Sequence, residues 1–297
     1  MSASASAHHN RDDVARGLIV GSTRLMGKLH AARARLIRAS VPLNMRATLG
    51  PVRGLESRGL TAYCVWRNAN SDAVASFIDG LAAGTVVHLH CLDEMPIGRT
   101  AQLTRSSGPG LRMPLLNRLI ETHPPAPGSD VLLFDDDVSF VGGGARLFGP
   151  VARTAGLDLA QPAHSPMSHS TFRVNQMRLL SIARDTGFVE SGPVVLMSQA
   201  AWERLLPFPA DIGMGWGLDV EWTKSCEAGL RIGVVDATPV RHLGPVATEY
   251  GVDSEWEILQ SRLRMVGASS IQQFAEIRGA CWRPWQRIPP WSRSPSP

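Results

Sequence analysis

Three consecutive aspartates follow a short apolar run, and this feature restricts the fold and chemistry of the chain more than any other. The sequence Val131-Leu-Leu-Phe-Asp135-Asp136-Asp137 predicts a buried strand with carboxylates at its carboxyl end. Ligands bind at that edge in open α/β sheets. Because side chains alternate along a strand, we expect Asp135 and Asp137 on the same side. A divalent cation relieves the repulsion among adjacent carboxylates, so we predict a metal or substrate site here.

The acidic run has three interpretations. A solvated acidic turn needs no ligand, and DxD sequences arise often by chance. Glycosyltransferases use such a run to hold a metal ion on the diphosphate of a sugar nucleotide. Phosphotransferases of the haloacid-dehalogenase type also place a nucleophilic aspartate after an apolar strand, but they need a lysine near the phosphoryl group. Lys224 is the only lysine downstream and is expected on a helix, so we rank the phosphotransferase lower.

Apolar runs alternate with helical patterns around this strand, which predicts an α/β fold with a parallel or mixed sheet covered on both faces. The expected strands are residues 61–66, 85–91, 130–134, 157–160 and 231–235. The expected helices are residues 72–81, 110–122, 199–206, 220–228 and 254–266.

Composition divides the chain into three parts. Residues 1–50 combine a disordered start with a basic amphipathic helix, from about Asp12 to Ser40, and the beginning of a linker over 42–59. Residues 51–270 are expected to form the catalytic domain. Residues 271–297 form a Pro/Trp/Arg-rich tail, in which the prolines exclude regular helix. The basic helix either packs on the domain with its charged face in solvent, which we favour, or lies on a membrane. The tail tryptophans allow the same two interpretations.

Charge and cysteine content narrow the function classes. The net charge of +4 suits an anionic substrate without requiring a nucleic acid, and we expect no nucleic-acid partner. None of the four cysteines forms a CxxC pair, which argues against a zinc site. We find no membrane-spanning apolar stretch and no secretory signal, which predicts a cytoplasmic protein. Peripheral contact at the inner face of the membrane, through the basic helix, stays open.

A second unusual segment is Gly213-Met-Gly-Trp-Gly-Leu-Asp219-Val-Glu221. Its glycines predict a tight loop that a ligand can approach closely, and Asp219 should lie in the first turn of the next helix. Trp216 beside a carboxylate suits a sugar, because the indole covers C–H faces while the acid binds hydroxyls. Helix capping by Asp219 is the alternative. His242 is expected in a loop, either as a structural histidine or as a metal ligand.

Taken in order, these segments resemble glycosyltransferases of the GT-A fold, most closely the domain-of-unknown-function family 707, known mainly from plants. The resemblance spans roughly residues 132–244. The matching pieces are Phe134-Asp-Asp-Asp137, Leu157-Asp-Leu-Ala-Gln161-Pro162, Gly187-Phe-Val-Glu190 with Pro193 and Ala201-Trp202, Gly215-Trp-Gly-Leu-Asp219, Cys226, and Gly233-Val-Val-Asp236 with His242 and Gly244. The family's middle acid is usually Glu rather than Asp136, which leaves the roles of the three acids less defined. The resemblance implies a GT-A fold with a single mixed, mostly parallel sheet flanked by helices.

The resemblance also implies an activity: metal-dependent transfer of a sugar from a nucleotide-diphosphate donor, a UDP-sugar being favoured, to a hydroxyl of a glycan or small-molecule acceptor. This is a hexosyltransferase-type reaction, with inversion favoured. Mn²⁺ or Mg²⁺ would be held by Asp135, Asp137 and His242, and the catalytic base would be Asp219, with Glu221 as its substitute. The other candidates are Arg67, Arg112, Asp135 and Asp136 for the donor, and Glu190, Trp216 and Gly217 for the acceptor or sugar. A non-catalytic sugar- or nucleotide-binding protein of the same fold is the rival interpretation.

Overall fold

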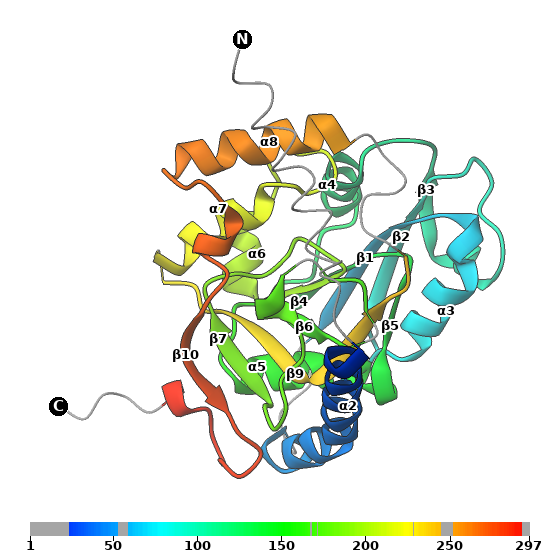
Figure 1. The fold of residues 1–297 in the computed structure, drawn as a ribbon. Helices are drawn as coiled ribbons and strands as arrows, with labels where there is room; N and C mark the ends of the chain where they lie inside the picture. The colour runs from blue at the N-terminus through cyan, green and yellow to red at the C-terminus, as the bar shows by residue number, and fades with distance from the viewer. Residues whose placement is uncertain are drawn as a thin grey trace.

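The computed structural model describes residues 24–52, 59–166, 168–170, 172–227, 229–244 and 252–292. A single sheet organises these residues, with helices on both of its faces (Figure 1). Three expectations fall outside the described residues: the disordered start, the beginning of the basic helix, and residues 53–58 of the linker. The side chain of Cys226 is also outside the description.

Within the described residues the sheet has ten strands, in the order β10-β7-β9-β6-β8-β4-β1-β2-β3, with β5 paired to β9 off this path. Their bounds are β1 Leu60–Trp66, β2 Val86–Cys91, β3 Thr104–Ser107, β4 Asp130–Phe134, β5 Val138–Phe140, β6 Leu159–His164, β7 Ala183–Thr186, β8 Val194–Met197, β9 Ile232–His242 and β10 Ile277–Trp282. Strands β8, β7 and β5 run opposite to the others. The sheet is therefore mixed and mostly parallel, as predicted.

The helices confirm the predicted alternation with strands. Their bounds are α2 Arg24–Val52, α3 Ser71–Asp79, α4 Arg112–Thr122, α5 Ala145–Thr154, α6 Gln199–Leu205, α7 Leu218–Glu227 and α8 Val252–Met265. Short 3-10 turns lie at Asn68–Asn70, Arg99–Leu103, Val141–Gly143, Arg173–Asn175, Ile271–Gln273 and Pro290–Ser292. Helix α5 and strands β3, β5, β7, β8 and β10 were not expected as elements.

Strand β4 shows how the sheet divides the core. Leu132 and Phe134 face a cluster that includes side chains of α3 and α5, whereas Val131 and Leu133 face a cluster that includes side chains of α4, α6 and α7. All four are buried, and burying one such side chain stabilises the fold by about 1.5–3 kcal/mol. The apolar run is therefore buried on both faces of the sheet, and residue 135 follows directly at the carboxyl end of β4.

Helix α2 packs on the domain over the part of it whose side chains are described, and its arginines there point away from the core. Val41 is buried with side chains of β6 and β9, and the buried Asn44 Nδ2 donates to the carbonyl oxygen of Ser181 at 2.7 Å. The expected linker from Pro42 is wrong up to Val52, because α2 continues through that proline. Packing of Val41 and Asn44 on both sides of Pro42 outweighs its helix-breaking cost of about 3 kcal/mol.

The C-terminal tryptophans divide between the core and the surface. Trp282 ends β10 and is fully buried, and Trp291 Nε1 donates to the carbonyl oxygen of Ala155 at 2.7 Å. Trp285 lies between them and is 69% exposed. Strand β10 pairs with β7 at the end of the sheet and stops before Pro284, as the prolines of this segment require.

Candidate active site

The three aspartates at the end of β4 each contact a basic side chain from a different element. Asp135 Oδ1 lies 2.7 Å from Arg112 Nη2 at the start of α4. Asp136 is nearly buried and accepts hydrogen bonds from the backbone nitrogen of Arg67, at 2.9 Å, and from its Nε, at 3.2 Å. Three elements therefore converge on the acidic run at this edge of the sheet.

Asp137 meets His242, with Asp137 Oδ1 and His242 Nε2 3.0 Å apart. The expectation that His242 belongs to a loop is wrong, because β9 continues to this residue. The reason is β5, which follows the acidic run and pairs antiparallel with the end of β9, placing Val138 opposite His242. The backbone nitrogen of Gly244 also donates to Asp137 Oδ2 at 3.0 Å. A Cβ at Gly244 would lie 2.5 Å from that oxygen, so any other residue there would displace the Asp137 carboxylate.

Mutual electrostatics tie this group together. Burial lowers the pKa of His242, but its hydrogen bond to Asp137 and the charge of Asp135 outweigh burial and raise it. Burial raises the pKa of Asp137, but the hydrogen bonds from His242 and Gly244 lower it on balance. Burial raises the pKa of Asp135, with partial compensation by Arg112. Asp135 and Asp137 therefore both act on His242, while Asp136 faces Arg67.

Asp219 lies in the first turn of α7 and is buried. Burial raises its pKa to about 7, opposed by hydrogen bonds from backbone nitrogens such as that of Val220 and reinforced by the charge of Glu190. The same Glu190 charge also raises the pKa of His242. The charge of Glu190 thus acts on both Asp219 and His242. The two predicted halves also meet at the 190–193 segment, because the backbone nitrogen of Asp135 donates to the carbonyl oxygen of Pro193 at 2.8 Å and Gly215 lies against Ser191.

Sequence reasoning missed the residues that hold Glu190. His164, the buried last residue of β6, places Nε2 3.2 Å from Glu190 Oε2 and Nδ1 2.8 Å from Ser168 Oγ. Ser168 Oγ also accepts from the backbone nitrogen of His242, and Gln161 Oε1 accepts from that of Glu190. Glu190 Oε1 is buried and has no hydrogen-bond partner among the described residues. Gln161 lay in a family-matching piece, but no motif singled out His164.

The glycine-rich loop before α7 has a structural explanation. Gly215 has a φ of +115°, and a Cβ there would lie 2.6 Å from Ser191 Oγ. Gly217 has a φ of +87°, and a Cβ there would lie 2.8 Å from Arg262 Cγ on α8. Trp216 contacts the ring of Trp256 edge-on at 6.3 Å between centroids. The loop is therefore fitted between α8 and the 190–193 segment, and the sugar-binding roles of Trp216 and Gly217 stay predictions.

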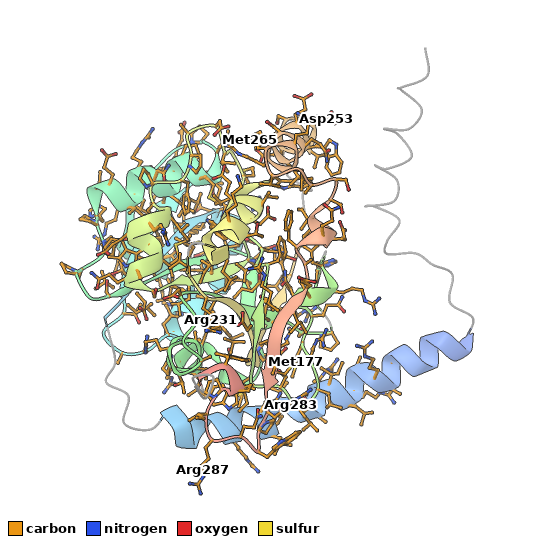
Figure 2. All side chains as sticks on the ribbon, turned by 90° about the vertical axis from the view of Figure 1, so that its left-hand side faces the viewer. Met177, Arg231, Asp253, Met265, Arg283 and Arg287 are labelled. Atoms are coloured by element: carbon orange, nitrogen blue, oxygen red, sulfur yellow. The ribbon has the colours of Figure 1, made fainter. Side chains whose placement is uncertain are left out.

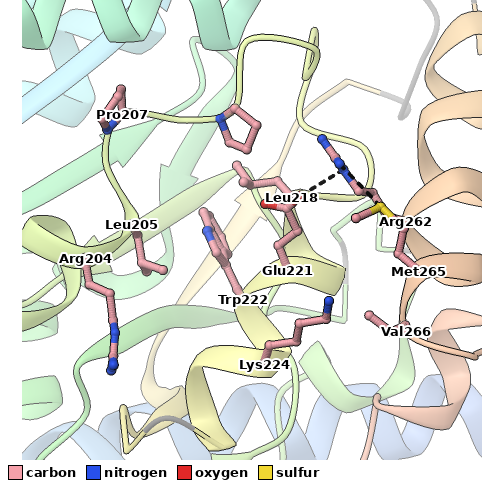
Figure 3. Close-up of a pocket in the computed structure, with 11 residues that line it drawn as sticks. Arg204, Leu205, Pro207, Leu218, Glu221, Trp222, Lys224, Arg262, Met265 and Val266 are labelled. Carbon is pink, nitrogen blue, oxygen red and sulfur yellow. Dashed lines mark hydrogen bonds and ion pairs between the residues drawn. The ribbon is translucent and has the colours of Figure 1, made fainter.

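Glu221 lies apart from this cluster, although it is only two residues from Asp219. Its Oε1 is 2.8 Å from Arg262 Nε, and both side chains line a cavity of about 450 Å³ between α6, α7 and α8 (Figure 3). Lys224 lines the same cavity and is exposed. Two residues along a helix turn the side chain through roughly half a revolution. The structure therefore separates Glu221 from Asp219, which weakens the prediction that it substitutes as base.

Asp137 and His242 fit a divalent cation. Their facing atoms, 3.0 Å apart, match the separation of about 3 Å expected for adjacent ligands at octahedral bond lengths of about 2.1 Å. Carboxylate and imidazole both suit Mn²⁺. The described residues hold no group of three or more His, Cys, Asp or Glu arranged for a metal, and Asp135 is paired with Arg112. The other ligands would be substrate oxygens, as is usual for Mg²⁺ sites.

Comparison with known proteins supports the fold and leaves the family open. No family model and no curated protein matches the chain, so the resemblance to family 707 stays a prediction. Among solved structures, GalNAc-T7 with UDP, GalNAc and Mn²⁺ matches with a TM-score of 0.50 at 10% identity, over 71% of this chain and 48% of that one. The chain thus spans about half the length of GalNAc-T7.

Two further structures match at lower TM-scores. TarS 1-349 of S. aureus with UDP gives 0.44 at 12% identity, covering 73% of this chain and 68% of that one. Glucosyl-3-phosphoglycerate synthase from Mycobacterium tuberculosis, with Mn²⁺, UDP and glucosyl-3-phosphoglycerate, gives 0.43 at 14% identity, covering 75% and 84%. The likeness to GalNAc-T7 shows the fold. The chain has the GT-A fold, as predicted.

Proposed function

We propose that the chain is a glycosyltransferase that moves a sugar from a nucleotide-diphosphate donor, a UDP-sugar being favoured, to an acceptor hydroxyl. The observation that carries the proposal is the buried Asp219 carboxyl, whose pKa burial raises to about 7. The glycine loop before it lies against Ser191, and the backbone nitrogen of Asp135 donates to the nearby carbonyl oxygen of Pro193 at 2.8 Å. A perturbed acid beside a charged cluster at a sheet edge is typical of a catalytic site. The GT-A fold, in which GalNAc-T7 binds UDP, GalNAc and Mn²⁺, supports the same class of reaction.

The acidic run would serve the donor. Asp137 and His242 would hold Mn²⁺ or Mg²⁺, which when bound neutralises charge on a diphosphate leaving group. Arg112 and Arg67, which now bind Asp135 and Asp136, would contact donor phosphates, because guanidinium groups pair with carboxylate and phosphate oxygens in the same way. This arrangement assigns the leaving group to one half of the site.

Asp219 would serve the acceptor. With a pKa of about 7, its carboxylate is available near neutral pH and basic enough to accept the proton of a hydroxyl as that oxygen attacks the anomeric carbon. Attack from the face opposite the leaving group inverts that carbon. Glu190 would bind acceptor or sugar hydroxyls. Its Oε2 is held by His164, and its buried Oε1, which has no hydrogen-bond partner among the described residues, would have to turn toward the substrate.

A thermal-shift panel of sugar nucleotides, with and without Mn²⁺, tests the donor half. We expect one donor to raise the melting temperature only when Mn²⁺ is present, and a His242→Ala variant to lose that shift. The same donor should then yield a transferred sugar with a suitable acceptor. If no sugar nucleotide shifts the wild-type protein and none is consumed, the proposal fails.

The rival functions make different predictions. A non-catalytic sugar- or nucleotide-binding protein would bind donor equally well as wild type and as the Asp219→Asn variant, and would transfer nothing in either form. The phosphotransferase needs a lysine at the acidic run, whereas Lys224 is exposed and lines the cavity beside Glu221 (Figure 3). Phosphate release from a simple phosphoester would nonetheless revive it.

A further inference from the structure

One face of the molecule combines positive charge with exposed apolar side chains. Residues 24–52 contain six Arg or Lys and no Asp or Glu, and residues 277–292 contain three Arg and no acid. We define the basic face by the exposed or partly exposed side chains of Arg33, Arg35, Arg38, Arg46, Arg283 and Arg287. Arg33, Arg35, Arg38 and Arg46 of α2 have no ion-pair partner among the described residues. Their charge is therefore not neutralised by the part of the protein that the structure describes.

The two segments of the basic face meet at one turn. Asn44 of α2 donates to the carbonyl oxygen of Ser181, and Arg283 Nη1 donates to that of the adjacent Leu180 at 3.1 Å. Figure 2 shows Arg283 beside α2, with Arg287 pointing outward below the helix. The C-terminal half of α2 and the segment after β10 therefore lie next to each other.

Large apolar side chains stand among these arginines. Leu36 and Leu43 on α2 are 62% and 51% exposed, and Trp285 and Ile288 after β10 are 69% and 47% exposed. Exposed apolar side chains that cluster on one face of a protein often mark an interaction site. Arginine and tryptophan together suit a lipid interface, where the charge meets headgroups and the rings sit at headgroup depth.

A groove of about 640 Å³ opens in this face between α2 and residues 173–179. Arg33, Arg173 and Arg178 line it, against Glu276 as the one acid among its lining residues. Partial burial, together with nearby Arg184 and Arg283, lowers the pKa of the Arg178 guanidinium. An anion in the groove would relieve this crowding of positive charge.

We propose that the basic face docks the protein on an anionic lipid bilayer, with Leu36, Trp285 and Ile288 entering the headgroup region and the groove seating lipid phosphates. The arginines favour an anionic partner. The exposed apolar side chains favour a partner that also has an apolar interior beneath its charged surface, as a bilayer has. A nucleic-acid backbone or an acidic peptide provides the negative charge without such an interior. Within the described residues no helix is both long and apolar enough to cross a bilayer, so the contact would be peripheral. The docking does not depend on the sugar transfer proposed above.

Sedimentation with vesicles tests the docking on the full chain. We expect wild type to bind vesicles that contain phosphatidylglycerol, to ignore pure phosphatidylcholine, and to be released by salt. The triple variant Arg33→Glu, Arg35→Glu, Arg38→Glu should bind at least about 100-fold more weakly, since each cation near an anionic surface contributes about 1 kcal/mol, or about fivefold in binding. The matched control Arg105→Glu, Arg118→Glu, Arg264→Glu changes the net charge equally at exposed sites on β3, α4 and α8, and should keep most of the binding.

Several outcomes would overturn the docking. Equal binding to both kinds of vesicle would exclude an electrostatic contact. Equal losses in the two triple variants would show that binding depends on the net charge of the protein and not on the basic face. Binding to heparin that depends on the α2 arginines, without binding to vesicles, would indicate a different anionic partner. Circular dichroism checks that each variant is folded. If the α2 variant is not folded, the double variant Trp285→Ala, Ile288→Ala takes its place. The proposal requires that this double variant bind anionic vesicles at least about tenfold more weakly, and a smaller loss would overturn it.

Discussion

Asp137 and Asp219 are aspartates of one candidate site, yet their surroundings shift their pKa values in opposite directions. Asp137 accepts hydrogen bonds from His242 and from the backbone of Gly244, and its pKa is lowered. Asp219 is more deeply buried and has the negative charge of Glu190 nearby, and its pKa is raised to about 7. Asp137 is therefore charged at any ordinary pH, whereas Asp219 exchanges its proton near neutrality.

This contrast separates two kinds of chemistry. A permanently charged carboxylate suits a cation or a fixed hydrogen bond, and a carboxyl poised near pH 7 suits proton transfer. Both kinds occur where α/β sheets bind ligands, and Glu190 couples them electrostatically. If the contrast reflects function, changes at the two aspartates should have different consequences for binding, rate and stability.

The largest expected effect is on the rate in an Asp219→Asn variant. Without a base, sugar transfer should fall by roughly 10²–10⁴-fold, while Mn²⁺-dependent donor binding stays unchanged. Initial rates of product formation and donor titrations by calorimetry measure the two quantities. Asp211→Asn, which changes an exposed acid in the loop before α7, is the matched control and should keep its rate. Loss of donor binding in Asp219→Asn would mean that Asp219 also binds the donor, contrary to the proposed separation of its role from that of Asp137.

The complementary change is at the Asp137–His242 pair. His242→Ala should weaken Mn²⁺-dependent donor binding by roughly 10–100-fold and leave metal-free nucleotide binding much less affected, because one ligand of the ion is lost. Asp137→Ala should behave alike. Calorimetric titration of donor with and without Mn²⁺ measures the difference. His88→Ala, on β2 and stacked with His123, controls for loss of an imidazole. If Mn²⁺ still strengthens donor binding in both His242→Ala and Asp137→Ala, these two residues do not hold the ion.

The pH dependence of the rate sharpens the assignment of Asp219. Its raised pKa means that the carboxyl is protonated below about pH 7 and cannot accept a proton. The value of kcat/KM should therefore fall on the acidic side, by roughly tenfold for each unit below the pKa. The measurement is a profile from about pH 5 to about pH 9 under subsaturating donor and acceptor. An acidic limb near pH 4 would indicate an ordinary solvated carboxylate.

The same residues show how far the sequence alone could lead. The apolar run before Asp135 predicted β4, since a strand buried on both faces needs continuous apolar residues. Three-residue β5 and four-residue β7 carry too few side chains for a readable alternation, and pairing with β9 holds them in place. Missing β5 is what led to the wrong loop assignment of His242. A helix through Pro42 was equally hidden, because tertiary packing of Val41 and Asn44 decides it.

The candidate site was predictable where a local pattern marks chemistry. The acidic run and the segment before Asp219 stand out in sequence, and both contact the 190–193 segment. His164 did not stand out, because a lone histidine in an apolar segment is ordinary. Only the fold brings it to Glu190. Glu221 and Asp219 look interchangeable in sequence, and only the direction of each side chain from α7 separates them.

Stability should change in opposite directions at the two aspartates. The pKa of Asp219 is higher in the folded than in the unfolded chain, so its ionisation increasingly destabilises the fold as pH rises from about 4 to about 7. The lowered pKa of Asp137 stabilises the fold above its unfolded pKa, and this stabilisation is lost as pH falls through the folded value. In metal-free buffer at about pH 8, Asp219→Asn should raise the free energy of unfolding and Asp137→Asn lower it, each by about 1–3 kcal/mol.

Denaturant unfolding at about pH 8 and at about pH 4 measures both differences. The gain in Asp219→Asn should shrink at the lower pH, where the wild-type carboxyl is itself protonated. A matching loss in both variants at about pH 8 would show that Asp219 is held by favourable hydrogen bonds more than it is disfavoured by burial.

The smallest expected effect is at Glu221. This residue is close to Asp219 in sequence but points to a different side of α7, so it tests which of the two matters for catalysis. Its carboxylate is partly exposed and pairs with Arg262, which also binds Asp211 at 2.6 Å. Glu221→Gln removes one of two acidic partners of that arginine. The free energy of unfolding should fall by only about 0.5–1 kcal/mol, because solvent screens partly exposed ion pairs. The transfer rate should stay within about threefold of wild type, because the side chain points away from Asp219. A loss approaching that of Asp219→Asn would place Glu221 in the chemistry and reverse the assignment of the base.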